Sequence, residues 1–182
     1  DFVAVYAVDT EPHVIVSLTQ LGPVRSKLVD SVRSVSVGGG GIWVDEGLRA
    51  AFEDLKKAKD VAARHIIVFA DASDTAQKEE GRYRDLLKEI TDDGITVSVI
   101  GLGSDTDPHA NLQRDIAARG NGRSFFQSDP FGIPALFAQE TMQVSRPAFN
   151  EKPEQVVETA GWSEIASGRM EWPAQVDGFN IT

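Results

Sequence analysis

The chain has 182 residues, with 18 basic and 28 acidic side chains and a formal net charge of −10. This length fits one domain of ordinary size with an appendage, and 41% hydrophobic and 25% charged residues are typical of a soluble globular protein. The acidic balance argues against nucleic acid as a partner. The lack of cysteine excludes disulfides and thiolate metal sites, and no apolar run approaches the ~20 residues that cross a bilayer.

The N-terminal part predicts a hairpin and two helices. Residues 2–8 (FVAVYAV) and 13–18 (HVIVSL) are strand-like runs joined by turn residues at positions 9–12. The spacing of apolar residues predicts a helix over 23–35 with an inward stripe of Val24, Leu28, Val32 and Val35. A glycine run, 38–41, opens onto a second helix over 43–59, whose inward face would carry Val44, Leu48, Ala51, Phe52 and Leu55.

From residue 64 onward, strands and helices alternate. Residues 65–70 (HIIVFA) predict a buried strand that ends at Asp71. A helix is expected over 76–92, with an inward face of Tyr83, Leu86, Leu87 and Ile90. Gly94 occupies the position of a left-handed helix cap before a strand over 95–102. Asp107-Pro108 predicts the start of a helix that ends near Gly120. A short strand over 123–127 and a helix from Asp129 to about 144 complete this part.

This alternation predicts an α/β fold, a doubly wound and mostly parallel open sheet with an antiparallel edge hairpin. We place a domain over residues 1–144 and a connector over 145–182, where the periodicity is weak. Trp162, Trp172 and Phe179 distinguish this connector from a disordered tail, and we expect them to dock on this domain or on a partner.

Five segments in this order resemble the von Willebrand factor type A domain: VYAVD (5–9), GGGGIWVDEGLRAA (38–51), HIIVFADASD (65–74), GITVSVIGLG (94–103) and GRSFF (122–126). The resemblance covers residues 1–144. The residues from Glu140 to Pro147 are similar to a bacterial subgroup, in which such a domain lies in a membrane-anchored protein ahead of a glutamine-amidotransferase-like domain. On this resemblance the chain is the soluble portion of such a protein.

The sequence departs from the family pattern at the metal site. The family's first strand, with its Asp-x-Ser-x-Ser motif, and the helix after it have no counterpart here, and Gly41-Ile42 stands where the family places a threonine. Asp71 is retained, with Ser73 as a weak second candidate ligand. Mg²⁺ takes about six oxygen ligands. We therefore expect a degenerate site that holds no metal tightly, and no cofactor.

The missing strand has a consequence for association. Residues 2–8 and 65–70 would each lack a neighbour, and free strand edges invite pairing with other chains. The gap could close on itself, or be filled by residues 146–182 or by a second copy of the chain. Of these, we expect a homodimer.

Other motifs give only weak support for a phosphate, dinucleotide, histidine metal or catalytic serine site. The glycine run lacks the Gly-x-x-x-x-Gly-Lys-Ser/Thr spacing of a phosphate loop, and Gly101-x-Gly103 lacks the third glycine of a dinucleotide site. His13, His65 and His109 have no metal-ligand spacing. No Gly-x-Ser-x-Gly nucleophile motif occurs.

We therefore predict a non-enzymatic protein–protein interaction module with an unidentified protein partner. Ligands of open α/β sheets bind beyond the carboxyl ends of the strands. The predicted binding rim consists of Gly39, Gly40, Gly41, Trp43, Asp71, Ser73, Asp74, Ser104 and Asp105. Two alternatives stay open: Mg²⁺-dependent adhesion in a longer protein, and part of an amidotransferase-like or hydrolase enzyme.

Overall fold

The computed structural model describes residues 1–36, 41–58, 61–72, 75–76 and 81–145, with four two-residue strands between 149 and 180. The chain divides into two units, Asp1–Glu140 and Thr141–Thr182. In the second unit, β8 (Phe149–Asn150) pairs antiparallel with β11 (Phe179–Asn180), and β9 (Glu154–Gln155) pairs antiparallel with β10 (Gln175–Val176). The first unit contains the predicted rim.

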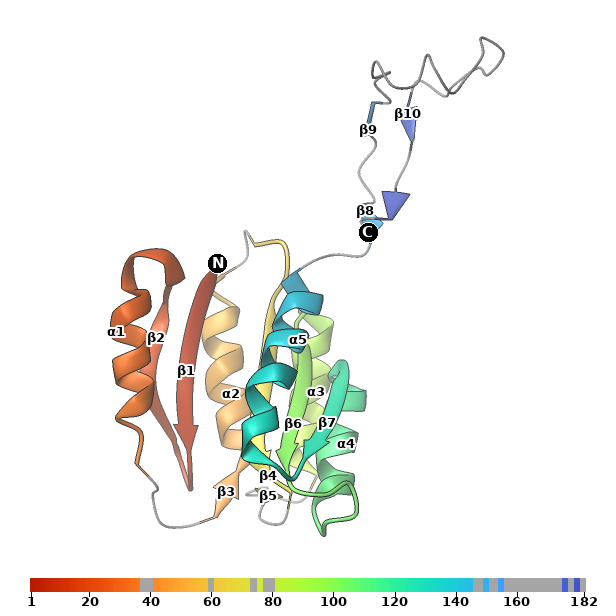
Figure 1. The fold of residues 1–182 in the computed structure, drawn as a ribbon. Helices are drawn as coiled ribbons and strands as arrows, with labels where there is room; N and C mark the ends of the chain where they lie inside the picture. The colour runs from red at the N-terminus through yellow and green to blue at the C-terminus, as the bar shows by residue number, and fades with distance from the viewer. Residues whose placement is uncertain are drawn as a thin grey trace. The chain divides into compact units, whose positions relative to one another are not determined.

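The centre of the first unit is a parallel three-stranded sheet. Its strands are β4 (His65–Asp71), β6 (Thr96–Leu102) and β7 (Asn121–Gln127), in the order β4-β6-β7. Helices α3 (Arg82–Asp92), α4 (Ala110–Arg119) and α5 (Ile133–Ser145) follow the three strands in turn (Figure 1). The α/β class predicted from the alternation of strands and helices is confirmed.

The expected hairpin is also confirmed. Strand β1 (Phe2–Val8) pairs antiparallel with β2 (Pro12–Gln20) in a sheet of two strands. The helix after it, α1 (Leu21–Arg33), contacts both strands, but none of its residues is buried and Val32 is exposed. The predicted inward stripe of this helix is therefore confirmed only in part: Val24 and Leu28 are half-buried, whereas Val32 and Val35 are exposed.

Two short strands join the ends of the longer ones. Strand β3 (Ile42–Trp43) pairs in parallel with β5 (Thr75–Ala76) and leads into α2 (Val44–Leu55). The second and third predicted helices are thus shorter than expected. Residues 75 and 76, assigned to a turn and to the start of a helix, form β5, and the described part of α3 begins at Arg82.

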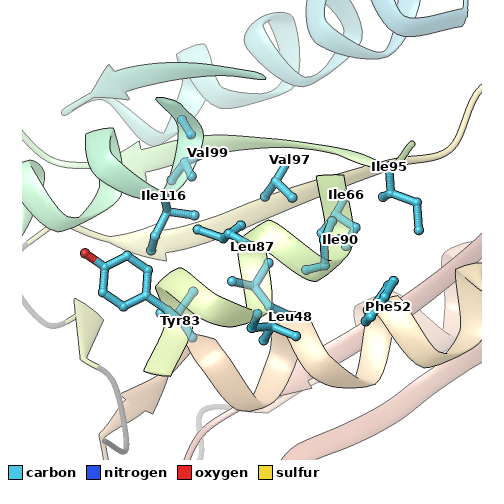
Figure 2. Packing of buried hydrophobic residues seen from close by; sticks show 13 residues of the cluster. Leu48, Phe52, Ile66, Tyr83, Leu87, Ile90, Ile95, Val97, Val99 and Ile116 are labelled. Carbon is cyan, nitrogen blue, oxygen red and sulfur yellow. The ribbon is translucent and has the colours of Figure 1, made fainter. Parts of the chain in front are cut away.

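The hydrophobic core lies between α2, α3, α4 and one face of the three-stranded sheet. Leu48 and Phe52 of α2 face Leu87 and Ile90 of α3, with Val97 of β6 above them (Figure 2). Leu87, Ile90 and Val97 are fully buried. The inward faces predicted for these two helices from their 3.6-residue periodicity are confirmed, with Ala51 and Leu55 partly buried at the margin.

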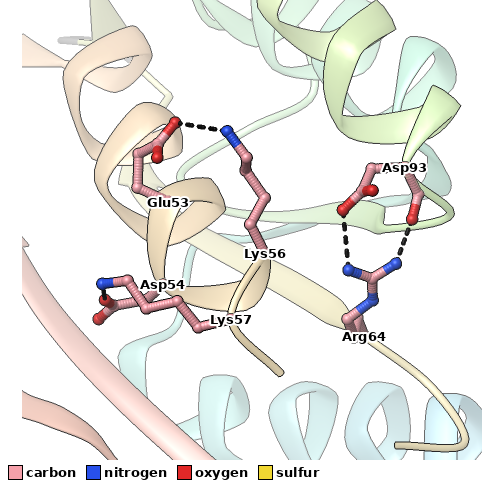
Figure 3. Close-up of polar contacts among 6 residues, drawn as sticks. All are labelled: Glu53, Asp54, Lys56, Lys57, Arg64 and Asp93. Carbon is pink, nitrogen blue, oxygen red and sulfur yellow. Dashed lines mark hydrogen bonds and ion pairs between the residues drawn. The ribbon is translucent and has the colours of Figure 1, made fainter. Parts of the chain in front are cut away.

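Arg64 anchors the chain just before β4. Its guanidinium group donates to the Asp93 carboxylate at 2.8 Å and to the Asp93 carbonyl, so it joins the start of β4 to the end of α3 (Figure 3). Its side chain is 15% exposed. Lys57 bonds Asp54 at 2.7 Å in the same view but is 70% exposed.

This contrast predicts different costs for removing the two cations. We expect Arg64→Met to lower the free energy of unfolding by about 1–3 kcal/mol, because the carbonyl and the carboxylate lose a shielded charged donor. Lys57→Met should change it by less than about 0.5 kcal/mol, since solvent screens exposed pairs. Urea unfolding followed by circular dichroism measures both, and equal costs would contradict the assigned role of Arg64.

Candidate functional site

The carboxyl ends of the strands meet at one edge of the first unit, which we call the rim. The ends of β4 and β6 are joined because Asp71 pairs with Leu102 and the Ala72 amide donates to the Leu102 carbonyl at 2.9 Å. The Gly103 amide donates to the Gln127 carbonyl at 3.0 Å and so joins the ends of β6 and β7. The rim is therefore a continuous backbone surface.

The hairpin side of the rim is closed by β3. The Trp43 amide donates to the carbonyl of Asp9, directly after β1, at 2.9 Å. The Asp9 carboxylate accepts from the Glu11 amide and from His13, and these hydrogen bonds lower the Asp9 pKa. Trp43 is half-buried at the start of α2, with its indole ring beside Gly41.

A tight loop after β6 shapes the middle of the rim. Gly103 has a φ of +131°, and a Cβ there would meet the Asp107 carboxylate at 2.4 Å. That carboxylate accepts from the Ser104 amide at 2.8 Å. Helix α4 begins at Ala110, later than the Asp107-Pro108 start predicted from the sequence, because Asp107 closes this loop instead of capping the helix.

An open depression lies between the ends of β6 and β7. Its volume is about 430 Å³, and its lining residues are Gly103, Ser104, Asp105, Phe126, Gln127 and Ser128. Arg114 of α4 lies over the Phe126 ring, 5.1 Å from its centroid, and its guanidinium group is 3.6 Å from the Asp105 carboxylate. The depression combines an aromatic wall with backbone polar groups and an exposed carboxylate, a surface suited to a polypeptide segment.

The structure brings together the described members of the predicted rim. Asp71, Ser104 and Asp105 lie along the connected ends of β4 and β6, and Gly41 and Trp43 lie on the β3 side. Gly39, Gly40, Ser73 and Asp74 lie outside the described residues. Sequence reasoning missed Phe126, Gln127 and Ser128, although their position at the end of a parallel strand was a sufficient signal.

Metal-ligand chemistry at the rim can be judged for its described part. There, no group of three or more histidine or acidic side chains is close enough to hold a metal ion. Asp71 is exposed at the end of β4. Of the other two described carboxylates there, Asp105 lies 3.6 Å from the Arg114 guanidinium group and Asp107 accepts from the Ser104 amide. These described donors do not match the oxygen set that Mg²⁺ needs.

A buried polar cluster lies on the other face of the three-stranded sheet. Glu140 of α5 is 1% exposed and accepts from the Ser98 hydroxyl at 2.6 Å and from the Arg123 guanidinium at 2.9 Å. Burial disfavours its charge, but the bonds from Arg123 and Ser98 prevail and lower the pKa of Glu140. His65 lies 3.4 Å from Glu140, and desolvation lowers the His65 pKa. This cluster fixes α5 on the sheet.

The described helices include none that is both long and apolar enough to cross a membrane. Several solved structures share the fold. BatB from Bacteroides thetaiotaomicron is 18% identical, with a TM-score of 0.65 over 81% of this chain and 80% of that one. An aerotolerance-related membrane protein from Bacteroides fragilis is 18% identical, with a TM-score of 0.61 over 79% of this chain and 80% of the other.

A von Willebrand factor type A protein from Catenulispora acidiphila is 19% identical, with a TM-score of 0.71 over 84% of this chain and 35% of that one. At these identities the likeness concerns the fold. No curated protein sequence matches the chain. The sequence model of the von Willebrand factor type A domain matches residues 1–139. That match covers the first unit almost completely, and the chain belongs to the von Willebrand factor type A domain family.

Proposed function

We propose that the first unit is a protein–protein interaction module and that the rim is its recognition surface. Domains of this family commonly mediate protein interactions. The observation that carries the proposal is the joining of Asp71, Ser104 and Asp105 along one edge, beside the open depression lined by Phe126. Aromatic side chains flanked by polar groups are the usual anchors of protein interfaces.

The module acts without catalysis. The Ser104 hydroxyl at the rim shares a hydrogen bond of 2.8 Å with the Thr106 hydroxyl, which is not a base. The buried Ser98 hydroxyl donates to Glu140 under α5, away from the rim. Nucleophilic catalysis needs a base within hydrogen-bond reach of the nucleophile, and Thr106 does not supply one to Ser104. Ser98 has the Glu140 carboxylate within reach, but both side chains are buried, so a substrate cannot contact them.

The rim recognises its partner without a tightly held Mg²⁺ ion. Among the described rim carboxylates, Asp105 lies 3.6 Å from the Arg114 guanidinium group and Asp107 is committed to its own loop, so Asp71 is the remaining candidate ligand. We therefore expect titration calorimetry with Mg²⁺ to give no heat of binding at millimolar concentrations. A saturable signal that Asp71→Ala removes would favour Mg²⁺-dependent adhesion instead.

We place this module outside the membrane, as part of a larger bacterial membrane protein in which residues 145–182 lead to an amidotransferase-like domain. The likeness of the first unit to an aerotolerance-related membrane protein supports this context. The sequence similarity from Glu140 to Pro147 also supports it.

Site-directed photocrosslinking tests the recognition surface. The chain contains no cysteine, so a benzophenone label on Ser104→Cys or Asp105→Cys goes to one site. When the purified, labelled protein of residues 1–182 is incubated with an extract and membranes of the cells that make it and then irradiated, we expect crosslinks to a distinct protein from both rim positions. Trp43→Ala and Asp71→Ala should each reduce that product about tenfold, as expected for a contact worth more than 1 kcal/mol.

The matched control is Asp92→Cys at the end of α3, which precedes the amino end of β6 and is exposed. Its label should give no such product. Equal crosslinking from Asp92 and the rim would contradict the proposed surface, as would products that neither alanine substitution changes.

A further inference from the structure

A short turn at the rim carries a strongly exposed aromatic side chain. The turn is the 3₁₀ helix η1 (Pro130–Gly132), which joins the end of β7 to the start of α5 (Figure 1). Its Phe131 is 92% exposed, whereas the other large hydrophobic residues that the structure describes reach at most 58%. The chain enters this turn directly from Gln127 and Ser128, which line the depression. Phe131 therefore extends the rim surface and contributes little to the core.

Hydrogen bonds on both sides hold this turn. The Asp129 carboxylate accepts from the Phe131 amide, and the Asp129 carbonyl accepts from the Gly132 amide, each at 3.0 Å. The Asp129 amide donates to the side-chain oxygen of Gln127 at 3.1 Å. A Cβ on Gly132 would overlap the Gln127 side chain, so the turn packs closely against a residue that lines the depression. The backbone that presents Phe131 is therefore fixed before a partner binds, which lowers the entropy cost of binding.

The charges beside this turn distinguish between the possible occupants. Asp129 is exposed, and Asp105, in the lining of the depression, is 67% exposed and 3.6 Å from the Arg114 guanidinium group. Asp71 adds an exposed carboxylate at the end of β4. Like charges disfavour an interface, and anionic lipid headgroups repel an acidic surface. Because the chain also has a net charge of −10, a membrane surface and a second copy are disfavoured, whereas a cationic protein surface is attracted.

We propose that Phe131 is the anchor of the rim, and that the partner is a protein whose apolar pocket receives the phenyl ring and is bordered by lysine or arginine. This inference rests on the proposed recognition role of the rim and adds the chemistry of the partner. An enclosed aromatic side chain buries ~150–250 Å², and a few such anchors dominate the energy of an interface. The cations of the partner then meet the carboxylates of Asp105 and Asp129.

Photocrosslinking from the position of the ring identifies what covers it. In the protein of residues 1–182, p-benzoylphenylalanine replaces Phe131, and the protein is irradiated with an extract and membranes of the cells that make it. We expect attachment to the same protein that crosslinks from Ser104→Cys and Asp105→Cys. Mass spectrometry of the digested product should locate the attachment at an apolar side chain of that protein, with lysine or arginine nearby.

The purified partner then gives a measurement that separates binding from folding. Because the ring is exposed, Phe131→Ala should leave the midpoint of urea unfolding unchanged and raise the Kd at least tenfold, and Phe131→Leu should raise it by a smaller factor. The matched control, Phe2→Ala, removes a ring that is 55% exposed at the amino end of β1, away from the rim, and should leave the Kd unchanged. Raising NaCl from about 50 to about 500 mM should raise the Kd at least threefold, because salt screens exposed charges.

The outcomes distinguish this inference from the proposed function. A product from Ser104→Cys that Asp71→Ala reduces, together with a Kd that Phe131→Ala leaves unchanged, would keep the rim as the recognition surface and overturn the anchor. The absence of product from all three positions would overturn both. Attachment within the same chain, to a second copy or to lipid would overturn the assigned partner, as would a Kd that salt does not change.

Discussion

Replacing Glu140 by alanine is expected to lower the free energy of unfolding by about 2–4 kcal/mol at pH 7. Removing one partner of a buried ion pair leaves an uncompensated charge and costs about 3–5 kcal/mol. The lower range applies here because the Arg123 side chain is 46% exposed and can turn to water. The Ser98 hydroxyl, which is fully buried, loses its acceptor as well. Urea unfolding with two spectroscopic probes measures the change.

The matched control is Gln139→Ala, the exposed neighbour of Glu140 on α5, which should change stability by less than about 0.5 kcal/mol.

The contribution of Glu140 to stability depends on pH. Because the folded pKa of Glu140 is lowered, the unfolded state binds more protons as the carboxyl group titrates, so the contribution of this carboxylate to the free energy of unfolding rises with pH. It is fully present above the unfolded pKa of about 4.3 and is lost as pH falls through the folded pKa. The difference between wild type and Glu140→Gln should therefore shrink below pH 4, and a difference independent of pH would contradict the assigned ion pair.

The sequence was sufficient for the elements whose burial is periodic. Tyr83, Leu86, Leu87 and Ile90 were predicted to face inward, and all four are buried. The same argument failed for Val32 of α1, because periodicity reports an apolar face but not the width of the surface that receives it. Asp71 was placed at the rim because the end of a parallel strand is recognisable before any contact is known.

The Glu140 cluster was missed because its members are far apart in sequence. Glu140 is the only charged residue in the sequence of α5, and Ser98 stands between two valines in β6, so each looks like an isolated exception. Two such exceptions on neighbouring elements are a signal of pairing, since a buried carboxylate needs donors. The register of β6 and the turn into β7 determine that Ser98 and Arg123 reach the same carboxylate, which sequence alone does not fix.

Gly103→Ala is expected to lower the free energy of unfolding by about 2–4 kcal/mol and to open the rim loop. A side chain at a φ of +131° is strained by about 1–3 kcal/mol. The new methyl group would also meet the Asp107 carboxylate at 2.4 Å, which must release the Ser104 amide. Urea unfolding gives the cost, and amide exchange of Ser104 reports the loop.

Substitutions at two other glycines separate the cost of backbone strain from the cost of steric overlap. Gly81 has a φ of +81°, and none of the described residues lies within 4 Å of its Cβ position, so Gly81→Ala should cost only the backbone strain, about 1–2 kcal/mol. Gly22 lies in α1 at an ordinary φ, also with no described neighbour within 4 Å of its Cβ position, and Gly22→Ala should stabilise the protein by about 0.5–1 kcal/mol. If Gly103→Ala costs no more than Gly81→Ala and leaves Ser104 protected, Asp107 does not hold the rim loop. If Gly103→Ala lowers the free energy of unfolding by more than Gly81→Ala does and the Ser104 amide loses its protection, the loop that shapes the depression depends on the Asp107 carboxylate. Partner binding should then weaken as this loop loses its structure.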